Sequence, residues 1–365
     1  MKGSSAASAS RGHRLNRVRS SAIAIGVLGL AAALATPVSS AGATSNSSKA
    51  KKGFTIAYIS QGTSNSWAAQ IDAVVNATAQ KSGVVKKLVY FNGEGSATTQ
   101  LPLISTAVAE HPDAIVLIPL GSSADVGPVE RAMAEKIPVV LCASTIASNN
   151  YTSIVNVNYA KAALPLANWL MDEMHHKGNL LDIGGLAGNA TTLDYDNALN
   201  TALKKNPNVH VVYKADASYS ISTAKQLAST AIASGKQING AWGDGGEAVT
   251  GIEQAYIDSK VRPIPPIAGG AATNGIIRLA VQNNIPSAML QFPAAMGKLC
   301  LTDAINVLQG KKVPKVIDVS ALPQYADIFS PNLTKFFNPK YTDDYYLGTN
   351  SVLTTSQLAA INLTK

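Results

Sequence analysis

Residues 54–67 read FTIAYISQGTSNSW, an apolar run that gives way to small polar residues and then to an aromatic one. The run has the length and apolar content of a buried strand. Apolar residues then recur at helical spacing, so we expect a helix over 67–81 with Ser66 as its N-cap. The loop at 61–66 offers hydroxyl and amide groups but no charge. Such a loop suits contact with an uncharged ligand, because an unpaired buried charge would cost far more free energy than a hydroxyl.

Short apolar runs alternate with longer amphipathic stretches from residue 54 to about residue 291. This alternation predicts parallel βαβ units. The pattern pauses at 148–151 and then restarts, which divides it into two sets of similar size. We therefore expect an α/β fold of two doubly wound parallel-sheet lobes with a cleft between them. A helix at 294–308 and a strand at 315–319 follow the second set, and we place them in the first lobe.

The first 43 residues have the composition of a cleavable signal peptide. Five basic residues precede the apolar run 22–35, and Ala41-Gly42-Ala43 supplies a site of the small-x-small kind. The apolar run is shorter than the roughly 20 residues that a membrane-spanning helix needs. We expect 1–43 to be removed, 44–52 to form a flexible leader and the product to be periplasmic or secreted, without a lipoprotein cysteine at its start.

Removal of the signal with its five bases lowers the formal net charge from +8 to +3. That change removes the main support for nucleic-acid binding. A content of 46% hydrophobic and 14% charged residues indicates a compactly folded chain. We expect a monomer that binds no nucleic acid.

Two cysteines, Cys142 and Cys300, occur in the chain. An oxidising compartment would allow them to pair. They fall near the ends of separate predicted elements, and we favour free buried thiols while leaving the pairing open.

Catalytic groups are scarce in the loops that follow the predicted strands. The histidines beyond the signal, His111, His175, His176 and His210, lie on the wrong side of the strands for a general base. The sequence has no GxSxG or HExxH motif and no spaced Cys/His set. We therefore expect no enzymatic activity, no metal and no cofactor. The glycines of 184–188 lack the spacing of a dinucleotide loop, and we predict a tight turn there.

Five segments at the predicted carboxyl ends of strands follow one another in a fixed order. They are ISQGTSNSW (59–67), DAIVLIPLGSSA (113–124), GGLAGNATTLDYDNAL (184–199), NGAWGDGGEAVTGIEQA (239–255) and SAMLQFPAAMG (287–297). With the signal peptide and the two lobes, this set resembles the type I periplasmic sugar-binding proteins of ABC transporters, above all the ribose-binding type. The resemblance covers about Phe54 to Ser320. Sugar-responsive repressors share this core, but no helix-turn-helix precedes it here.

The resemblance implies two lobes that are joined by three chain crossings and close like a hinge on a ligand. The crossings would fall near 156–158, 291–293 and 318–320. The lobes would comprise 53–156 plus 293–318 and 157–292 plus 319–330, with 331–365 as a tail wrapping the surface. An ABC permease at the membrane would recognise the closed form.

The resemblance also assigns candidate ligand contacts. Asn65 matches an amide of the first loop, Trp67 an aromatic residue that packs on a sugar ring, Asp244 a hydrogen-bond acceptor and Gln291 an amide at the second crossing. An aromatic face suits the apolar side of a pyranose, while amides and carboxylates can pair with its hydroxyls.

Several charged residues of the family are missing from the chain. Ala143-Ser144 replace an Asp-Arg pair, Leu193 replaces an arginine, and Gly243 and Gly269 replace an asparagine and an aspartate. The residues expected to substitute for them are Ser144, Thr145, Asn189, Thr192, Asp194 and Tyr195.

These observations favour an extracytoplasmic solute-binding protein of an ABC importer, with a small neutral sugar or polyol as ligand. A sensory or chemotactic receptor on the same fold is the alternative. An exported hydrolase or lyase would require Asp194 or Asp244 to be catalytic.

Overall fold

A computed structural model describes residues 53–63, 65–321, 336–347 and 352–362. The predicted signal peptide and the whole of the predicted leader lie outside these residues, as do residues 322–335. In the described ranges, no helix is both long and apolar enough to cross a membrane.

The first lobe is built on a sheet of six parallel strands in the order β11-β5-β4-β3-β1-β2. The strands are β1 (Phe54–Ser60), β2 (Val85–Asn92), β3 (Ala114–Leu117), β4 (Val139–Cys142), β5 (Ser153–Asn156) and β11 (Val316–Asp318). The helices of this lobe are α1 (Ser66–Lys81), α2 (Ala97–Ala109), α3 (Val126–Ala134) and α9 (Met296–Leu308). Every residue of β3 and β4 is buried, as helices on both faces of a parallel sheet require.

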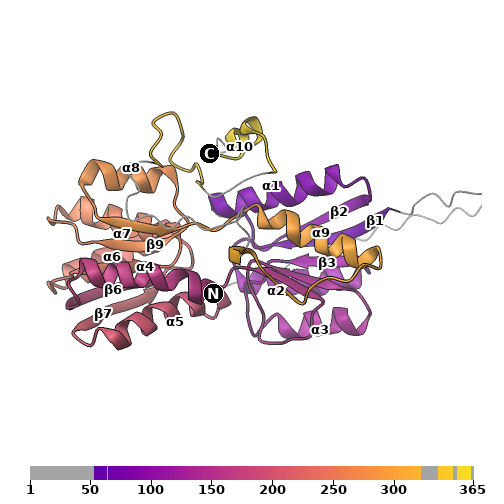
Figure 1. Cartoon of the computed structure of the whole chain (residues 1–365), viewed down its shortest axis with the longest axis horizontal. Helices are drawn as coiled ribbons and strands as arrows, with labels where there is room; N and C mark the ends of the chain where they lie inside the picture. The colour runs from indigo at the N-terminus through magenta and orange to yellow at the C-terminus, as the bar shows by residue number, and fades with distance from the viewer. Residues whose placement is uncertain (1–52, 64, 322–335, 348–351, 363–365) are drawn as a thin grey trace, which may run out of the picture. The chain divides into compact units, whose positions relative to one another are not determined.

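The second lobe has five parallel strands in the order β10-β9-β8-β6-β7. The strands are β6 (Gly178–Gly184), β7 (Val209–Asp216), β8 (Gly240–Gly243), β9 (Ile267–Gly270) and β10 (Ser287–Leu290). The helices are α4 (Tyr159–Glu173), α5 (Ala190–Lys205), α6 (Ile221–Ala233), α7 (Gly246–Ser259) and α8 (Asn274–Asn283). Figure 1 shows both lobes, which confirm the predicted fold class.

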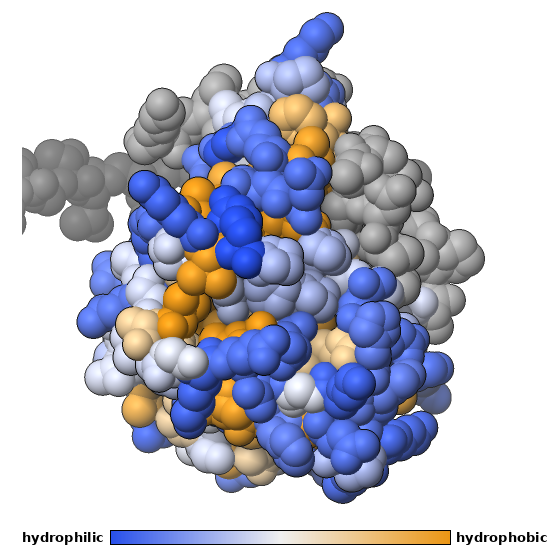
Figure 2. All heavy atoms as spheres, turned by 90° about the vertical axis from the view of Figure 1, so that its left-hand side faces the viewer, coloured by the Kyte–Doolittle hydropathy of each residue, from blue (hydrophilic) through white to orange (hydrophobic). Residues whose placement is uncertain are grey.

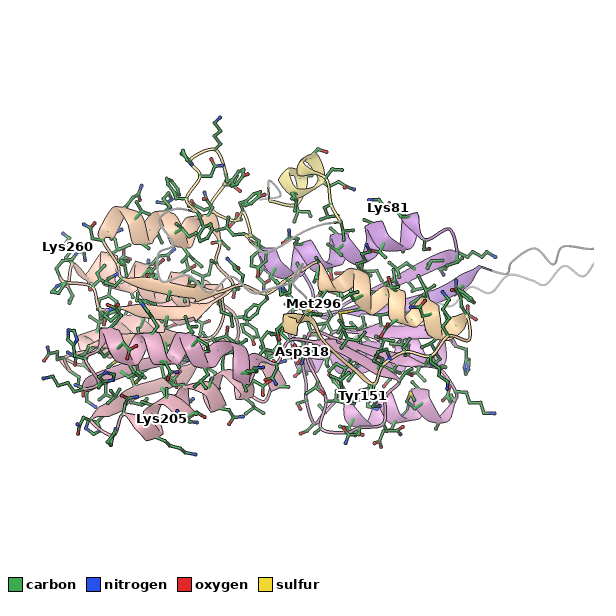
Figure 3. All side chains as sticks on the ribbon, viewed as in Figure 1. Lys81, Tyr151, Lys205, Lys260, Met296 and Asp318 are labelled. Atoms are coloured by element: carbon green, nitrogen blue, oxygen red, sulfur yellow. A yellow bond between two sulfur atoms is a disulfide. The ribbon has the colours of Figure 1, made fainter. Side chains whose placement is uncertain are left out.

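The chain passes between the two sheets more than once. β5 belongs to the first sheet, whereas the next helix, α4, packs on strands of the second. After β10 the chain returns, because α9 packs on β3, β4 and β5. Figure 3 labels Met296 and Asp318, the residues that begin α9 and end β11.

The C-terminal part of the chain contacts both lobes. The 3-10 turn Val319–Ala321 follows β11 directly. Residues 336–347 lie against the start of α8 in the second lobe, and α10 (Thr355–Asn362) packs on α1 in the first. Figure 2 views the second lobe from the left-hand end of Figure 1, and shows a largely hydrophilic face with apolar residues in a central band.

Two local predictions need correction. The N-cap of α1 is Asn65 rather than Ser66, because the Asn65 side chain accepts a hydrogen bond from the backbone N–H of Ala68 over 2.8 Å. The strand β5 was not predicted, since its four residues, SIVN, are too few to show a period.

The preference for free thiols was wrong. Cys142 at the end of β4 and Cys300 in α9 form a disulfide, with their Cα atoms 5.7 Å apart. The two cysteines are separated by 158 residues in the sequence. They meet because α9 packs on β4, and no local sequence pattern predicts a contact between segments so distant in the chain.

Candidate ligand-binding site

A cavity with about 570 Å³ of empty space, part of it open to solvent, is lined by residues of both lobes. Residues that follow β1, β3 and β4 meet residues that follow β6, β7, β8 and β9, so the carboxyl ends of both sheets face the same space. The lining includes the side chains of Asn65, Trp67, Ser144, Asn189, Tyr219, Asp244, Glu247 and Phe292.

The wall supplied by the first lobe is uncharged. Asn65 uses its side-chain oxygen to cap α1, which leaves the amide nitrogen as the donor it can offer. Trp67 presents its indole to the cavity, and its Nε1 is buried without a hydrogen-bond partner among the described residues. Ser144 is only 5% exposed, and its Oγ has no partner there either. Buried polar groups are nearly always paired, so these two groups are suited to pair with a bound molecule.

The wall supplied by the second lobe contains a carboxyl group held by two hydroxyls. Asp244 follows β8, and its Oδ2 accepts a hydrogen bond of 2.6 Å from Thr192 Oγ1 and one of 3.4 Å from the Tyr219 hydroxyl. Burial raises the pKa of Asp244 to about 7. Gly185 lies so close to Asp244 and Tyr219 that a Cβ atom would overlap both. This close approach explains the glycine, in agreement with the predicted turn at 184–188.

Glu247 provides a second carboxyl group on the same wall. It lies in the first turn of α7, three residues after Asp244. Burial, with a contribution from the charge of Asp244, raises its pKa to about 7. None of the described residues that line the cavity is a lysine, arginine or histidine. Each carboxyl group is therefore easier to protonate than an exposed one and can accept or donate hydrogen bonds to hydroxyls near neutral pH.

Asn189 lines the cavity, but both polar atoms of its side chain form hydrogen bonds within the protein. Its Oδ1 accepts from the N–H of Thr191 over 2.9 Å and so caps α5. Its Nδ2 donates to the carbonyl oxygens of Pro119 and Leu120 in the first lobe, over 3.4 and 3.2 Å. In this arrangement Asn189 connects the lobes, whereas the sequence suggested a ligand contact.

Five predicted contacts lie outside the lining: Thr145, Thr192, Asp194, Tyr195 and Gln291. Tyr195 is fully buried behind the wall, with its ring centroid 5.6 Å from that of Trp242. Asp194 lies three residues after Thr191, and α5 carries it about 4.5 Å further along the helix axis. Gln291 donates to the carbonyl oxygen of Ala272 over 3.3 Å, while its neighbour Phe292 lines the cavity. Phe292 therefore takes the place at the cavity wall that the sequence assigned to Gln291.

The lining residues that were not predicted as contacts include Tyr159, Tyr219, Glu247 and Phe292. Tyr219, Glu247 and Phe292 occur in segments that follow strands, so their position along the chain was a signal for the site. Tyr159 begins α4 just after the first crossing. The described residues contain no cluster of three or more His, Cys, Asp or Glu side chains able to hold a metal ion.

Comparison with known proteins places this site in a family. The galactofuranose-binding protein YtfQ of Escherichia coli K12 is 22% identical over 224 residues, which cover 60% of this chain and 70% of that protein. The ribose import binding protein RbsB of Bacillus subtilis 168 is 21% identical over 267 residues, covering 73% and 86%.

Solved structures have the same fold. A galactofuranose-binding protein has a TM-score of 0.70 at 19% identity, over 78% of this chain and 96% of its own. A Mycobacterium smegmatis protein in complex with β-D-fucofuranose has a TM-score of 0.71 at 17% identity, over 85% and 98%. The sequence pattern of the periplasmic binding protein domain matches residues 56–312. The predicted resemblance is thus confirmed: the chain belongs to the periplasmic binding protein family, whose relatives named here are sugar-binding proteins.

Proposed function

We propose that the chain is the exported solute-binding component of an ABC importer and binds a small sugar-like molecule, neutral overall, between its lobes. The observation that carries the proposal is the cavity itself, where Ser144 Oγ and Trp67 Nε1 are buried and have no hydrogen-bond partner in the part of the chain that the structure describes. A polyol can pair with such groups and with the carboxyl groups of Asp244 and Glu247 while its apolar face rests on Trp67. Micromolar affinity requires only about 8 kcal/mol of binding free energy.

The same proposal covers export of the protein, its monomeric state and delivery of the ligand to a permease. Cleavage of the predicted signal after residue 43 would release a soluble monomer, which fits a family of periplasmic proteins. The ligand would be held and released unchanged, because the named relatives are binding proteins rather than enzymes. The closed form would then deliver the ligand to a membrane permease.

Calorimetric titration of the chain from residue 44 with D-galactose, D-fucose, L-arabinose, D-ribose and xylitol tests the proposal. At least one compound should bind with micromolar or better affinity and be recovered intact. Ser144→Ala should weaken that binding about tenfold, since it removes one hydroxyl partner in a buried site. Ser222→Ala, which alters an exposed serine in the first turn of α6, is the matched control. Absence of binding to every compound would refute the proposed ligand class.

A further inference from the structure

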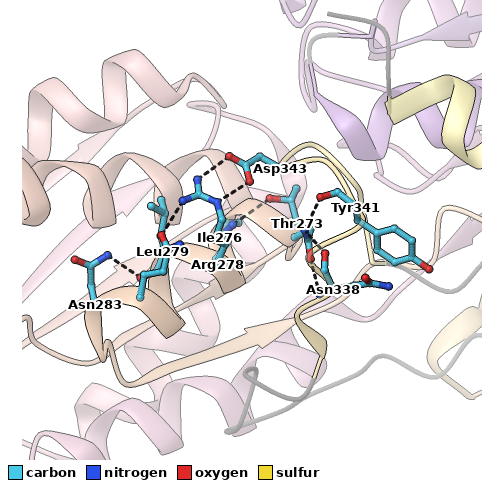
Figure 4. A network of polar contacts seen from close by, with 10 residues as sticks. Thr273, Ile276, Arg278, Leu279, Asn283, Asn338, Tyr341 and Asp343 are labelled. Carbon is cyan, nitrogen blue, oxygen red and sulfur yellow. Dashed lines mark hydrogen bonds and ion pairs between the residues drawn. The ribbon is translucent and has the colours of Figure 1, made fainter.

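The C-terminal segment 336–347 is fixed to the second lobe by a dense set of polar contacts (Figure 4). Asn274 is 1% exposed, and its side-chain nitrogen donates to the carbonyl oxygens of Asn338 and Tyr341 over 3.1 and 3.0 Å. Its side-chain oxygen accepts from the N–H of Asn338 over 3.1 Å. Arg278 pairs with Asp343 through two hydrogen bonds of 2.8 and 2.7 Å. The buried contacts of Asn274 and the bidentate pair of Arg278 with Asp343 together fix the position of the segment on α8.

This attachment places Tyr346 at the crossing between the lobes. Tyr346 is 2% exposed and forms an antiparallel bridge with Thr273. Its hydroxyl accepts a hydrogen bond of 2.8 Å from the N–H of Phe292 and donates one of 2.6 Å to the carbonyl oxygen of the same residue. A single hydroxyl therefore holds both backbone groups of Phe292.

Phe292 needs such a partner because of its position in the chain. It lies between the end of β10 and the start of α9, where neither a strand ladder nor a helix satisfies its backbone. It is only 7% exposed, and a buried backbone group without a partner is costly. The hydroxyl of Tyr346 supplies the hydrogen bonds that a strand or helix would otherwise provide to this backbone.

The same residue forms part of the cavity wall. The Phe292 ring meets that of Tyr159 edge-on, at 5.0 Å between centroids and 81° between planes, and lies 6.0 Å from the ring of Tyr195. Phe292 and Tyr159 both line the cavity. A shift of the Phe292 backbone would therefore move an aromatic face against which a ligand rests.

We propose that Tyr346 is a positioning residue of the ligand site, which holds Phe292 in the cavity wall so that the segment 336–347 is part of the binding machinery. The inference rests on the proposed function for its effect on affinity, but the contact between the two residues can be tested without any ligand. It assigns a role to a part of the chain for which the sequence suggested only a surface tail.

Tyr346→Phe removes the hydroxyl and keeps the ring, so it is the decisive variant. Labelling with ¹⁵N-phenylalanine marks the six phenylalanines of the chain, and Phe292→Leu identifies the Phe292 amide signal. In Tyr346→Phe the Phe292 amide should exchange with solvent at least about tenfold faster, because its acceptor is lost. The amide of Phe54 in β1 should not change.

Binding to D-fucose and L-arabinose supplies the second readout. Tyr346→Phe should weaken the binding of either sugar about tenfold. In the Phe292→Leu background the same change should alter affinity less than about twofold, since the ring through which Tyr346 acts is gone. Tyr345→Phe is the matched control, because it also removes a tyrosine hydroxyl from the segment, and the Tyr345 ring stacks on that of Tyr341 with 3.9 Å between centroids.

Two results would overturn the inference: unchanged exchange of the Phe292 amide in Tyr346→Phe, or an equal loss of affinity in both backgrounds, which would indicate a general structural role. If the unaltered protein binds neither these sugars nor any other compound of the panel, the proposed function fails. The exchange measurement then still decides whether Tyr346 holds Phe292.

Discussion

The side-chain amide of Asn189 reaches from the second lobe to the first, where its nitrogen lies 3.2 Å from the carbonyl oxygen of Leu120. The same nitrogen also donates to the carbonyl oxygen of Pro119. Family members close around their ligands by moving two lobes, so a bond of this kind favours the closed arrangement.

Asn189→Asp should favour separation of the lobes. The aspartate keeps the oxygen that caps α5, but it loses both donated bonds and places negative charge against two carbonyl oxygens. The radius of gyration of the ligand-free protein, measured by small-angle scattering, should increase, with little change in thermal stability. Asn158→Asp alters the N-cap of α4 in the same chemical way and should leave the scattering curve unchanged. A curve for Asn189→Asp that overlays the unaltered one would contradict this expectation.

Asp244 and Glu247 should make the ligand-free protein less stable as the pH rises. Burial raises the pKa of each to about 7, whereas an unfolded chain releases these protons near pH 4. Between about pH 4 and pH 7 the folded state therefore binds more protons, and its stability falls with pH by up to about 1.4 kcal/mol per unit for each group.

Chemical denaturation from pH 4.5 to pH 8 measures this slope. Asp244→Asn should flatten it, and Glu247→Gln should flatten it as well. Glu173→Gln, which alters an exposed carboxylate of α4, should have no effect. Parallel curves for Asp244→Asn and the unaltered protein would show that Asp244 does not titrate in this range.

The disulfide should contribute about 2–5 kcal/mol to the free energy of unfolding, because it closes a long loop in the unfolded chain. The double variant Cys142→Ala/Cys300→Ala should unfold at correspondingly lower denaturant concentration. A reductant should bring the unaltered protein close to the double variant and leave the variant itself unaffected. Detection of two free thiols in the denatured, unreduced protein would show that the bridge is absent.

Trp67 should contribute to the affinity for a sugar mainly through the area of its ring. Trp67→Ala should weaken binding of the best sugar of the panel by ten- to a hundredfold, or about 1.5–3 kcal/mol. Trp67→Phe keeps an aromatic face and loses Nε1, so its loss of affinity should be smaller. Titration calorimetry of both variants measures the difference. Equal losses would show that the indole N–H, rather than the ring face, carries the contact.

The repeating units of the fold could be predicted because strand and helix differ in period and length. β1 and α7, for example, stand out from their loops as an apolar run and an amphipathic stretch. The short strand β5 and the pairing of Cys142 with Cys300 could not be predicted. Both depend on segments that are distant in sequence and meet only when the sheet assembles.

The site shows the same division. Asp244 directly follows β8, and Asn65 and Trp67 lie where the loop after β1 enters α1, so the topology alone brings these residues to one edge. The choice between Gln291 and Phe292 depends on the direction in which a side chain leaves an irregular segment. The direction of the Phe292 side chain cannot be predicted from the sequence. It is fixed here by the hydrogen bonds between the Phe292 backbone and the Tyr346 hydroxyl.

The edge strand β11 has a consequence for how the protein is made. Val316 pairs with Ile154 in the first sheet, so the last strand of that sheet is also the last to be synthesised. While translation is still in progress, β5 keeps an unpaired edge and the amino-terminal lobe stays incomplete. The nascent polypeptide can therefore complete this sheet only after residue 318 has been synthesised.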